Sequence, residues 1–290
     1  MTIFNTVQSI IEAAENDNTT ISTITLRQTA FETDRSEDDI LKQMAENLTV
    51  MKEAVIDGCA PGLKSISGLT GDWAHQVKSR FENGGGFCGS FVGEVIYNSL
   101  AVMHVNACMG KIVAAPTAGS CGILPGCLIA LQNHHGLTDR QLINGLINAS
   151  AIGIIIAKNA TLSGAWGACQ SECGSAAAMT ASAITEIMGG TPAMCGIAAA
   201  TALKALMGLV CDPVAGLVEE PCIIRNATSA AVALTSAETA LAGIPSIVPV
   251  DEVIKAMDAV GKQLPPSLRE TAEGGIAVSP TGKRIAAGLQ

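Results

Sequence analysis

The sequence predicts an all-α fold, in which buried central helices carry a site formed by the loops between them. Apolar residues recur at the three- and four-residue spacing of helices, whereas the alternation typical of strands is scarce. The chain shows no βαβ rhythm and no repeat of fixed period. Its 290 residues are 48% hydrophobic but only 3% aromatic. Small aliphatic side chains must therefore fill the core, and they let helices pack closely.

The N-terminal part, residues 1–60, is predicted to be helical. Ser36 and the three acids that follow it resemble a capping box at the start of a helix. From Ile40 onward, apolar residues recur at helical spacing with acids and lysines on the opposite face. Gly58 is a plausible C-cap for this helix. The amphipathic pattern indicates that residues 1–83 pack on the outside of a larger core.

The rest of the chain, residues 84–290, is predicted to be that core, within a single domain of residues 1–290. Gly84-Gly85-Gly86 break the N-terminal pattern, and most of the charge is lost after them. Several of the following segments are apolar on more than one face, which is typical of buried helices. The predicted core helices cover residues 92–113, 140–160, 173–189, 192–210 and 226–243.

The connections between these helices hold most of the glycines, prolines and special polar residues. Glycine and proline set backbone shapes that other residues adopt only at a cost in free energy. Loops of this kind are expected to form a site where helix ends converge. They cover residues 115–126, 159–174, 211–222 and 269–282.

Charge and motif content exclude several functional classes. The formal net charge of −9 argues against nucleic-acid binding, which needs a basic patch for the phosphates. The sequence shows no N-terminal signal and no uninterrupted apolar run of membrane-spanning length, so a cytoplasmic protein without a membrane segment is expected. No HExxH or GxSxG motif is present, which excludes a zincin site and a nucleophile elbow.

The loop at residues 115–126 is a candidate anion site. Thr117, Gly119 and Ser120 can direct backbone N–H groups and two hydroxyls at one anion, for example a carboxylate. The loop lacks the Gly-Lys-Ser/Thr ending of a Walker A motif. A plain turn that caps the next helix explains the pattern equally well.

The ten cysteines are the other candidate chemical groups. In a reducing compartment they are expected to be buried thiols or ligands rather than disulfides. Cys169 and Cys173 are four residues apart, while Cys211 and Cys222 are separated by eleven (222 − 211). Three or four thiolates from dispersed loops suit an iron–sulfur site better than a structural zinc, which usually shows short paired spacings. Spacing alone leaves both buried thiols and a metal site open.

Four ordered motifs resemble a known family. They are "MGKIVAAPTAGSCGILPG" (109–126), "KNATLSGAWGACQSECGSAAAM" (158–179), "LVCDPVAGLVEEPCIIRNA" (209–227) and "LRETAEGGIAVSPTG" (268–282). In this order they resemble the iron–sulfur-dependent L-serine dehydratases, and in particular the α chain of the two-chain form. The resemblance runs through most of residues 90–285.

The resemblance implies a [4Fe–4S] cluster held by Cys169, Cys211 and Cys222, with one iron left open as a Lewis acid. Cys173 is not a ligand position of the family, and it is interpreted as a buried neighbour of the cluster. The remaining six cysteines are expected to fill the core.

The resemblance also implies the reaction and the partner. The reaction is dehydration and deamination of L-serine to pyruvate and ammonia, with Thr117, Gly119 and Ser120 binding the substrate carboxylate. Lys158 is a candidate base, although it could instead orient a carboxylate or cap a helix end. A separate β subunit is expected to supply a Ser-Ser-His-Thr motif that this chain lacks.

Two positions depart from the family pattern. Trp166 and His104 stand where the family usually has acidic residues, and they are expected near the cluster. Their presence leaves other substrates open, namely L-cysteine with loss of sulfide, or threonine. A different class also stays open, a catalytically inactive iron–sulfur subunit.

Overall fold

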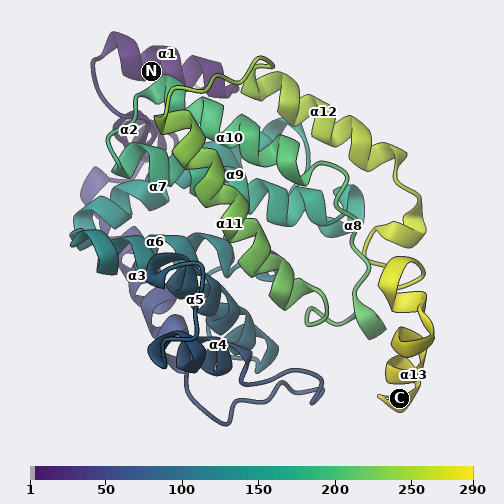
Figure 1. Cartoon of the computed structure of the whole chain (residues 1–290). Coiled ribbons are helices and arrows are strands. Elements are labelled where there is room, and N and C mark those ends of the chain that lie inside the picture. The colour runs from purple at the N-terminus through teal and green to yellow at the C-terminus, as the bar shows by residue number, and fades with distance from the viewer. Residues whose placement is uncertain (1–3, 290) are drawn as a thin grey trace.

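The computed structural model describes residues 4–289 and has the predicted all-α fold (Figure 1). Residues 4–289 contain no strand, and their only β-type pairing is an isolated parallel bridge between Cys211 and Arg269. The N-terminal helices are α1 (Val7–Asn16), α2 (Ile21–Thr33), α3 (Glu37–Gly58) and α4 (Trp73–Glu82). The larger helices that follow are α5 (Ser90–Ala107), α6 (Ile123–His135), α7 (Asp139–Asn159), α9 (Ser175–Ile187), α10 (Pro192–Leu206), α11 (Cys222–Leu241), α12 (Val250–Gln263) and α13 (Pro280–Gly288).

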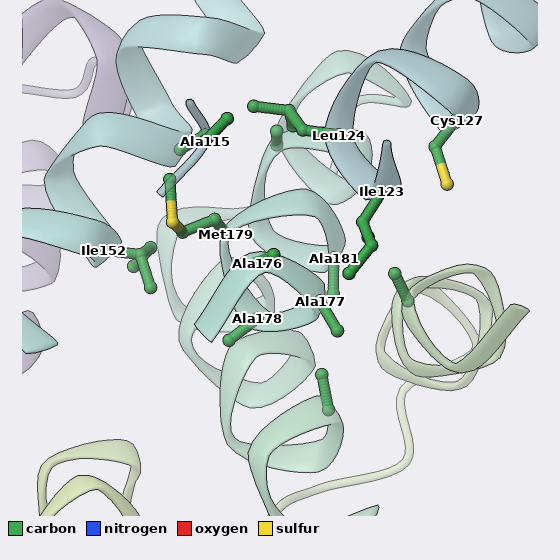
Figure 2. Packing of buried hydrophobic residues seen from close by; sticks show 14 of the residues in the cluster. Ala115, Ile123, Leu124, Cys127, Ile152, Ala176, Ala177, Ala178, Met179 and Ala181 are labelled. Carbon is green, nitrogen blue, oxygen red and sulfur yellow. The ribbon is translucent and has the colours of Figure 1, made fainter. Parts of the chain in front are cut away.

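Helix α9 is the centre of the fold. It packs against α7, α10, α11 and α6, and every residue from Ser175 to Thr185 is buried. Figure 2 shows Ala176, Ala177, Ala178 and Ala181 on this helix among larger side chains of its neighbours. Because alanine adds little bulk, the surrounding helices can approach the α9 backbone closely. The small-residue core expected from composition is therefore built around one helix.

The predicted core helices exist, with shifted ends. Predicted residues 92–113 correspond to α5, and the later predictions correspond to α7, α9, α10 and α11. Helix α11 begins four residues earlier than predicted, at Cys222. The predicted loop at 159–174 holds a short helix, α8 (Gly164–Gly167), and a π-helical turn, η2 (Gln170–Gly174). Helices α4, α6, α12 and α13 have no counterpart among the predicted helices.

The N-terminal helices cover the outside of this core. Helix α1 contacts α10, α2 contacts α7, and α3 contacts α5. The start of α1 is held by α12, because Asp251 accepts hydrogen bonds from the N–H groups of Val7 at 2.8 Å and Gln8 at 3.0 Å. A carboxylate at a helix N-terminus also interacts favourably with the helix dipole. Helix α1 is thus attached to α12, 244 positions further along the chain.

Helix α7 is an internal helix despite its apolar sequence. Among the described residues, it alone is long and apolar enough to cross a membrane by length and composition. However, 67% of its most apolar window is buried inside the protein. This burial is typical of a core helix, since the apolar residues already face protein rather than lipid.

Gly58 is required by packing, and its predicted role as a C-cap is wrong. The helix includes Gly58 as its last residue, and Cys59 is the cap. A β-carbon at position 58 would overlap the carbonyl group of Ala101 in α5. The absence of a side chain therefore sets how closely α3 approaches α5.

We expect Gly58→Ala to destabilise the fold by about 1–3 kcal/mol, because overpacking against backbone exceeds the gain in helix propensity of up to about 1 kcal/mol. Gly288→Ala in α13 is the control, since nothing lies within 4 Å of its β-carbon position. Urea denaturation measures both. Equal unfolding midpoints for the two variants would contradict this account of Gly58.

Candidate active site

Cys169 lies on a strained segment that is anchored on both sides. Ala168 has φ 63° and ψ −171°, a region that residues other than glycine rarely adopt, and the π-helical turn η2 follows. Gln170 is fully buried, and its Nε2 donates to the Met257 carbonyl at 3.0 Å while its Oε1 accepts from Gly208 N at 2.8 Å. These bonds to α12 and to the end of α10 hold the turn in place. Strain and π-helical turns of this kind are common at functional sites.

Cys211 is held by the C-terminal segment 268–276. Its N–H donates to the Leu268 carbonyl at 2.9 Å, and its carbonyl accepts from Glu270 N at 2.9 Å. Arg269 of the same segment donates to the carbonyl of Trp166 at 3.4 Å. The segment 268–276 therefore joins the Cys211 loop to the stretch just before Cys169.

A buried ion pair fixes the loop between Cys211 and Cys222. Arg225 Nη2 lies 2.8 Å from Asp212 Oδ1, and Arg225 Nη1 donates to the Val210 carbonyl at 2.9 Å. The second oxygen of Asp212 accepts from Ile276 N at 2.8 Å. Gly275 has φ 57°, and a β-carbon there would overlap the Asp212 carboxylate. Glycine is therefore needed at position 275 for this contact.

The three predicted cysteines converge at one place. Cys169 and Cys211 are each 3% exposed and Cys222 is 7% exposed, and all ten cysteines are free thiols. Gln170 N donates to the Leu209 carbonyl at 3.0 Å, which holds the turn of Cys169 beside the segment that carries Cys211, and η2 also packs against α11, which begins at Cys222. Cys173 joins them, since its sulfur lies 3.4 Å from that of Cys169.

Burial and neighbouring charge set the acidity of these thiols. Burial is the main cause that raises the pKa of Cys211, and it raises that of Cys222 to about 12. The pKa of Cys169 is lowered instead, by the hydrogen bond with Cys173 and then by the positive charge of Arg225. Arg225 is thus the cation that compensates thiolate charge at this site.

The loop with the predicted anion-binding residues lies against α11. Thr117 Oγ1 and Ser120 Oγ are 3.0 Å apart, and the residues between them form a 3-10 turn, η1 (Ala118–Ser120). Asn226 Nδ2 donates to the Gly119 carbonyl at 2.8 Å, and Asn226 Oδ1 accepts from Gly122 N at 2.9 Å. The structure therefore brings Thr117, Gly119 and Ser120 together, one helical turn away from Cys222.

A carboxyl group faces this loop. A β-carbon at Gly119 would lie 3.2 Å from Glu172 Oε1, and one at Gly164 would lie 2.6 Å from Glu172 Oε2 and 3.0 Å from Glu270 Oε2. The two carboxylates therefore meet in front of Gly164. Burial raises the pKa of Glu172 to about 7, the nearby Thr117 hydroxyl lowers it, and the charge of Glu270 raises it.

The side chains of three other sequence candidates make no hydrogen bond to the cysteines or to the loop of Thr117. Lys158 is exposed at the end of α7, where Nζ donates a hydrogen bond to the Phe4 carbonyl at 3.5 Å. Trp166 is 71% exposed. His104 is buried with its ring 5.7 Å from that of Trp73, and burial lowers its pKa.

Five residues of the site were missed by the sequence reasoning, namely Glu172, Asp212, Arg225, Asn226 and Glu270. The first four lie within four residues of a predicted cysteine ligand, whereas Glu270 lies in the motif at residues 268–282. This proximity along the chain is the signal that could have identified the first four.

A surface cavity of about 580 Å³ opens beside the loop. Its lining includes Ala118 of the loop, Leu217 between Cys211 and Cys222, and the exposed apolar residues Ile66 and Met109. The cavity therefore borders the loop at Ala118, while neither Thr117 nor Ser120 lines it.

Fold and site together define a class of helical protein in which thiols from separate segments meet beside a hydroxyl-bearing loop. A family model described as the serine dehydratase alpha chain matches residues 15–277. The chain is 44% identical over 283 residues to the probable L-serine dehydratase, alpha chain of Bacillus subtilis (strain 168), which covers 98% of this chain and 94% of that protein. The chain belongs to the serine dehydratase alpha chain family.

Two other relatives differ from each other in how much of their length the match covers. The L-serine dehydratase, alpha chain of Peptoniphilus asaccharolyticus is 38% identical over 283 residues, with 98% of this chain and 97% of the relative covered. The L-serine dehydratase of Streptomyces coelicolor is 34% identical over 284 residues, which cover 95% of this chain but 61% of the relative. The longer relative therefore contains a further region outside the match.

We expect Asp212→Ala to destabilise the protein by about 3 kcal/mol, because removal of one partner leaves the largely buried Arg225 without its carboxylate. Asp258→Ala is the matched control. It breaks an exposed pair with Lys262 in α12, worth about 0.5 kcal/mol. Chemical denaturation under reducing, anaerobic conditions gives both values. The role assigned to Asp212 is wrong if the two variants unfold at the same denaturant concentration.

Proposed function

We propose that the chain is the α subunit of an L-serine dehydratase, a lyase that converts L-serine to pyruvate and ammonia. The convergence of Cys169, Cys211 and Cys222 beside the loop of Thr117 and Ser120 is the observation that carries this proposal. Membership of the serine dehydratase alpha chain family supports it.

The cysteine site fits a [4Fe–4S] cluster. Its donors are soft thiolates, the ligands that iron–sulfur clusters use, and none of them is committed to a disulfide. Among the described residues, no three His, Cys, Asp or Glu side chains are placed to share a single metal ion. Cys169, Cys211 and Cys222 would hold it, and Cys173 would be a buried neighbour.

When bound, a cluster with three protein ligands supplies an open iron that acts as a Lewis acid toward the substrate hydroxyl. The reaction removes the α-proton and the hydroxyl of serine as water. The resulting aminoacrylate becomes an imine, and hydrolysis of the imine releases pyruvate and ammonia. The residues of this chain must therefore hold the carboxylate and the ammonium group while these bonds break.

The loop and the carboxylate pair suit these two charged groups. The hydroxyls of the half-buried Thr117 and the buried Ser120 lie 3.0 Å apart on either side of Gly119, and we infer that they and the loop backbone hold the substrate carboxylate. Glu172 lies beside the Thr117 hydroxyl and faces Gly119, with Glu270 close to it, and neither carboxyl group has a cationic side chain paired with it among the described residues. The α-ammonium of an amino acid would supply that missing positive charge.

Lys158 stays a prediction for the base. Its ammonium group is exposed and contacts the Phe4 carbonyl. A role in proton removal would require this contact to break and the side chain to turn toward the loop. The alternative, a lysine that stabilises the C-terminal end of α7, fits its position in the last turn of that helix.

A β-type partner is part of the proposal. The relatives that match over nearly their whole length are named as alpha chains, and the Streptomyces coelicolor relative is longer than the match. The surface cavity near Ala118, with Ile66 and Met109 exposed beside it, gives such a partner access to the loop. The partner would supply the predicted Ser-Ser-His-Thr motif.

The activity is tested with the chain alone and with a co-expressed β-type chain, after anaerobic reconstitution with iron and sulfide. We expect L-serine to give pyruvate, with slower or no turnover of L-threonine and L-cysteine. Single Cys→Ser replacements at 169, 211 and 222 should each remove most of the bound iron and the activity. Cys173→Ser and the half-buried Cys88→Ser are the controls, and both should retain iron.

Iron and sulfide per chain, together with visible absorbance, measure the outcome. Retention of the cluster after replacement of any of the three ligands would show that the ligand set is wrong. Turnover of another amino acid but not of serine would contradict the substrate assignment, while a loaded complex inactive toward all three would favour an inactive subunit.

We expect Glu172→Gln to raise the KM for L-serine at least about tenfold, because a charge-assisted contact to the ammonium group is lost. Binding of lactate, which lacks the ammonium group, should change less than binding of L-alanine. Glu273→Gln is the control, since Glu273 is an exposed carboxylate in the same C-terminal segment. Equal weakening of lactate and alanine would indicate that Glu172 does not recognise the ammonium group.

A further inference from the structure

One fully buried amide joins the two halves of the site. Asn226 has no exposed surface, and its side chain makes three hydrogen bonds. Nδ2 donates to the Gly119 carbonyl at 2.8 Å and to the Cys222 carbonyl at 2.9 Å. Oδ1 accepts from Gly122 N at 2.9 Å. The amide therefore contacts the backbone of the loop on both sides of Ser120 and the backbone of a predicted ligand.

Only a side chain with both a donor and an acceptor can make this set of bonds. An aspartate would keep the acceptor for Gly122 N but lose both donors, and an alanine would leave the Gly119 carbonyl and Gly122 N without their partner. The fit is also tight. A β-carbon at Gly122 would lie 3.2 Å from Asn226 Oδ1 and would overlap the Ser99 carbonyl. The loop and the first turn of α11 are thus packed together with no spare space at this point.

We propose that Asn226 is a positioning residue, which holds the loop of Thr117 and Ser120 in a fixed position relative to Cys222. The proposal rests on the proposed function, because it assigns to that loop the binding of the substrate carboxylate. Asn226 itself contacts backbone only. Its effect on substrate acts through the loop, and its effect on the cysteine site acts through the first turn of α11.

The proposal predicts a specific pattern of changes. Loss of the amide frees the loop, while Cys222 stays on the intact helix α11. Substrate binding should therefore weaken although the bound iron is retained. A purely structural role would instead lower stability without a selective change in the loop.

The test compares Asn226→Ala with Asn148→Ala in the reconstituted complex. Asn148 is an equally buried asparagine in α7, where its amide bonds with Glu186 and Ser182. Both replacements should lower the unfolding midpoint. Asn226→Ala alone should raise the KM for L-serine about tenfold or more, and speed amide hydrogen exchange at residues 120–122 by a similar factor, with iron per chain unchanged.

A second variant, Asn226→Asp, tests the proposal if Asn226→Ala does not fold. Asn226→Asp keeps the size of the side chain and the acceptor for Gly122 N, and it should change KM and loop exchange in the same direction. Wild-type KM and wild-type exchange in a folded Asn226 variant would overturn the proposal, as would the same changes in Asn148→Ala. If the wild-type complex turns over no amino acid, the proposed function fails, and hydrogen exchange still decides the role of Asn226.

Discussion

The ion pair between Asp212 and Arg225 is the interaction on which the rest of the site depends. It connects the loop after Cys211 to the first turn of α11, and Asp212 also holds the C-terminal segment through Ile276 N. Arg225 in addition supplies positive charge to buried thiols that would otherwise repel one another as they ionise. This one ion pair therefore fixes the positions of the segments that carry the cysteines and also supplies positive charge close to them.

The core allows this arrangement because its central helix is made of small residues. Helices around α9 can lie close together, and their ends then bring four distant loops to one side of the fold. The unfavourable backbone at Ala168 and the π-helical turn after it persist because Gln170 is bonded to two neighbouring elements. Local strain at Cys169 is therefore compatible with a stable protein, since well-packed helices surround it.

Much of the fold could be predicted from the pattern of apolar residues. The helices and contacts that this prediction missed were missed for physical reasons. Residues 140–160 and 192–210 carry enough apolar periodicity to identify α7 and α10. Helix α12 was missed although it is amphipathic, as was α6, which contains Pro125 in its first turn, where proline is tolerated. Gly58 was misread as a cap because the sequence does not show that Ala101 of another helix lies against it.

By itself the sequence determined the helical class and the family to which its four motifs point, and it predicted the cysteines and loop residues of the proposed site. These follow from residue type and order along the chain. Only the tertiary structure decided which groups meet. Glu172 faces Glu270 across Gly164, Asn226 joins the loop to Cys222, and Lys158 contacts residue 4. Such contacts depend on how the helices cross and where the loops run. They join residues that are 107 positions apart, as for Asn226 and Gly119, or 154 apart, as for Lys158 and Phe4, so no local sequence pattern reveals them.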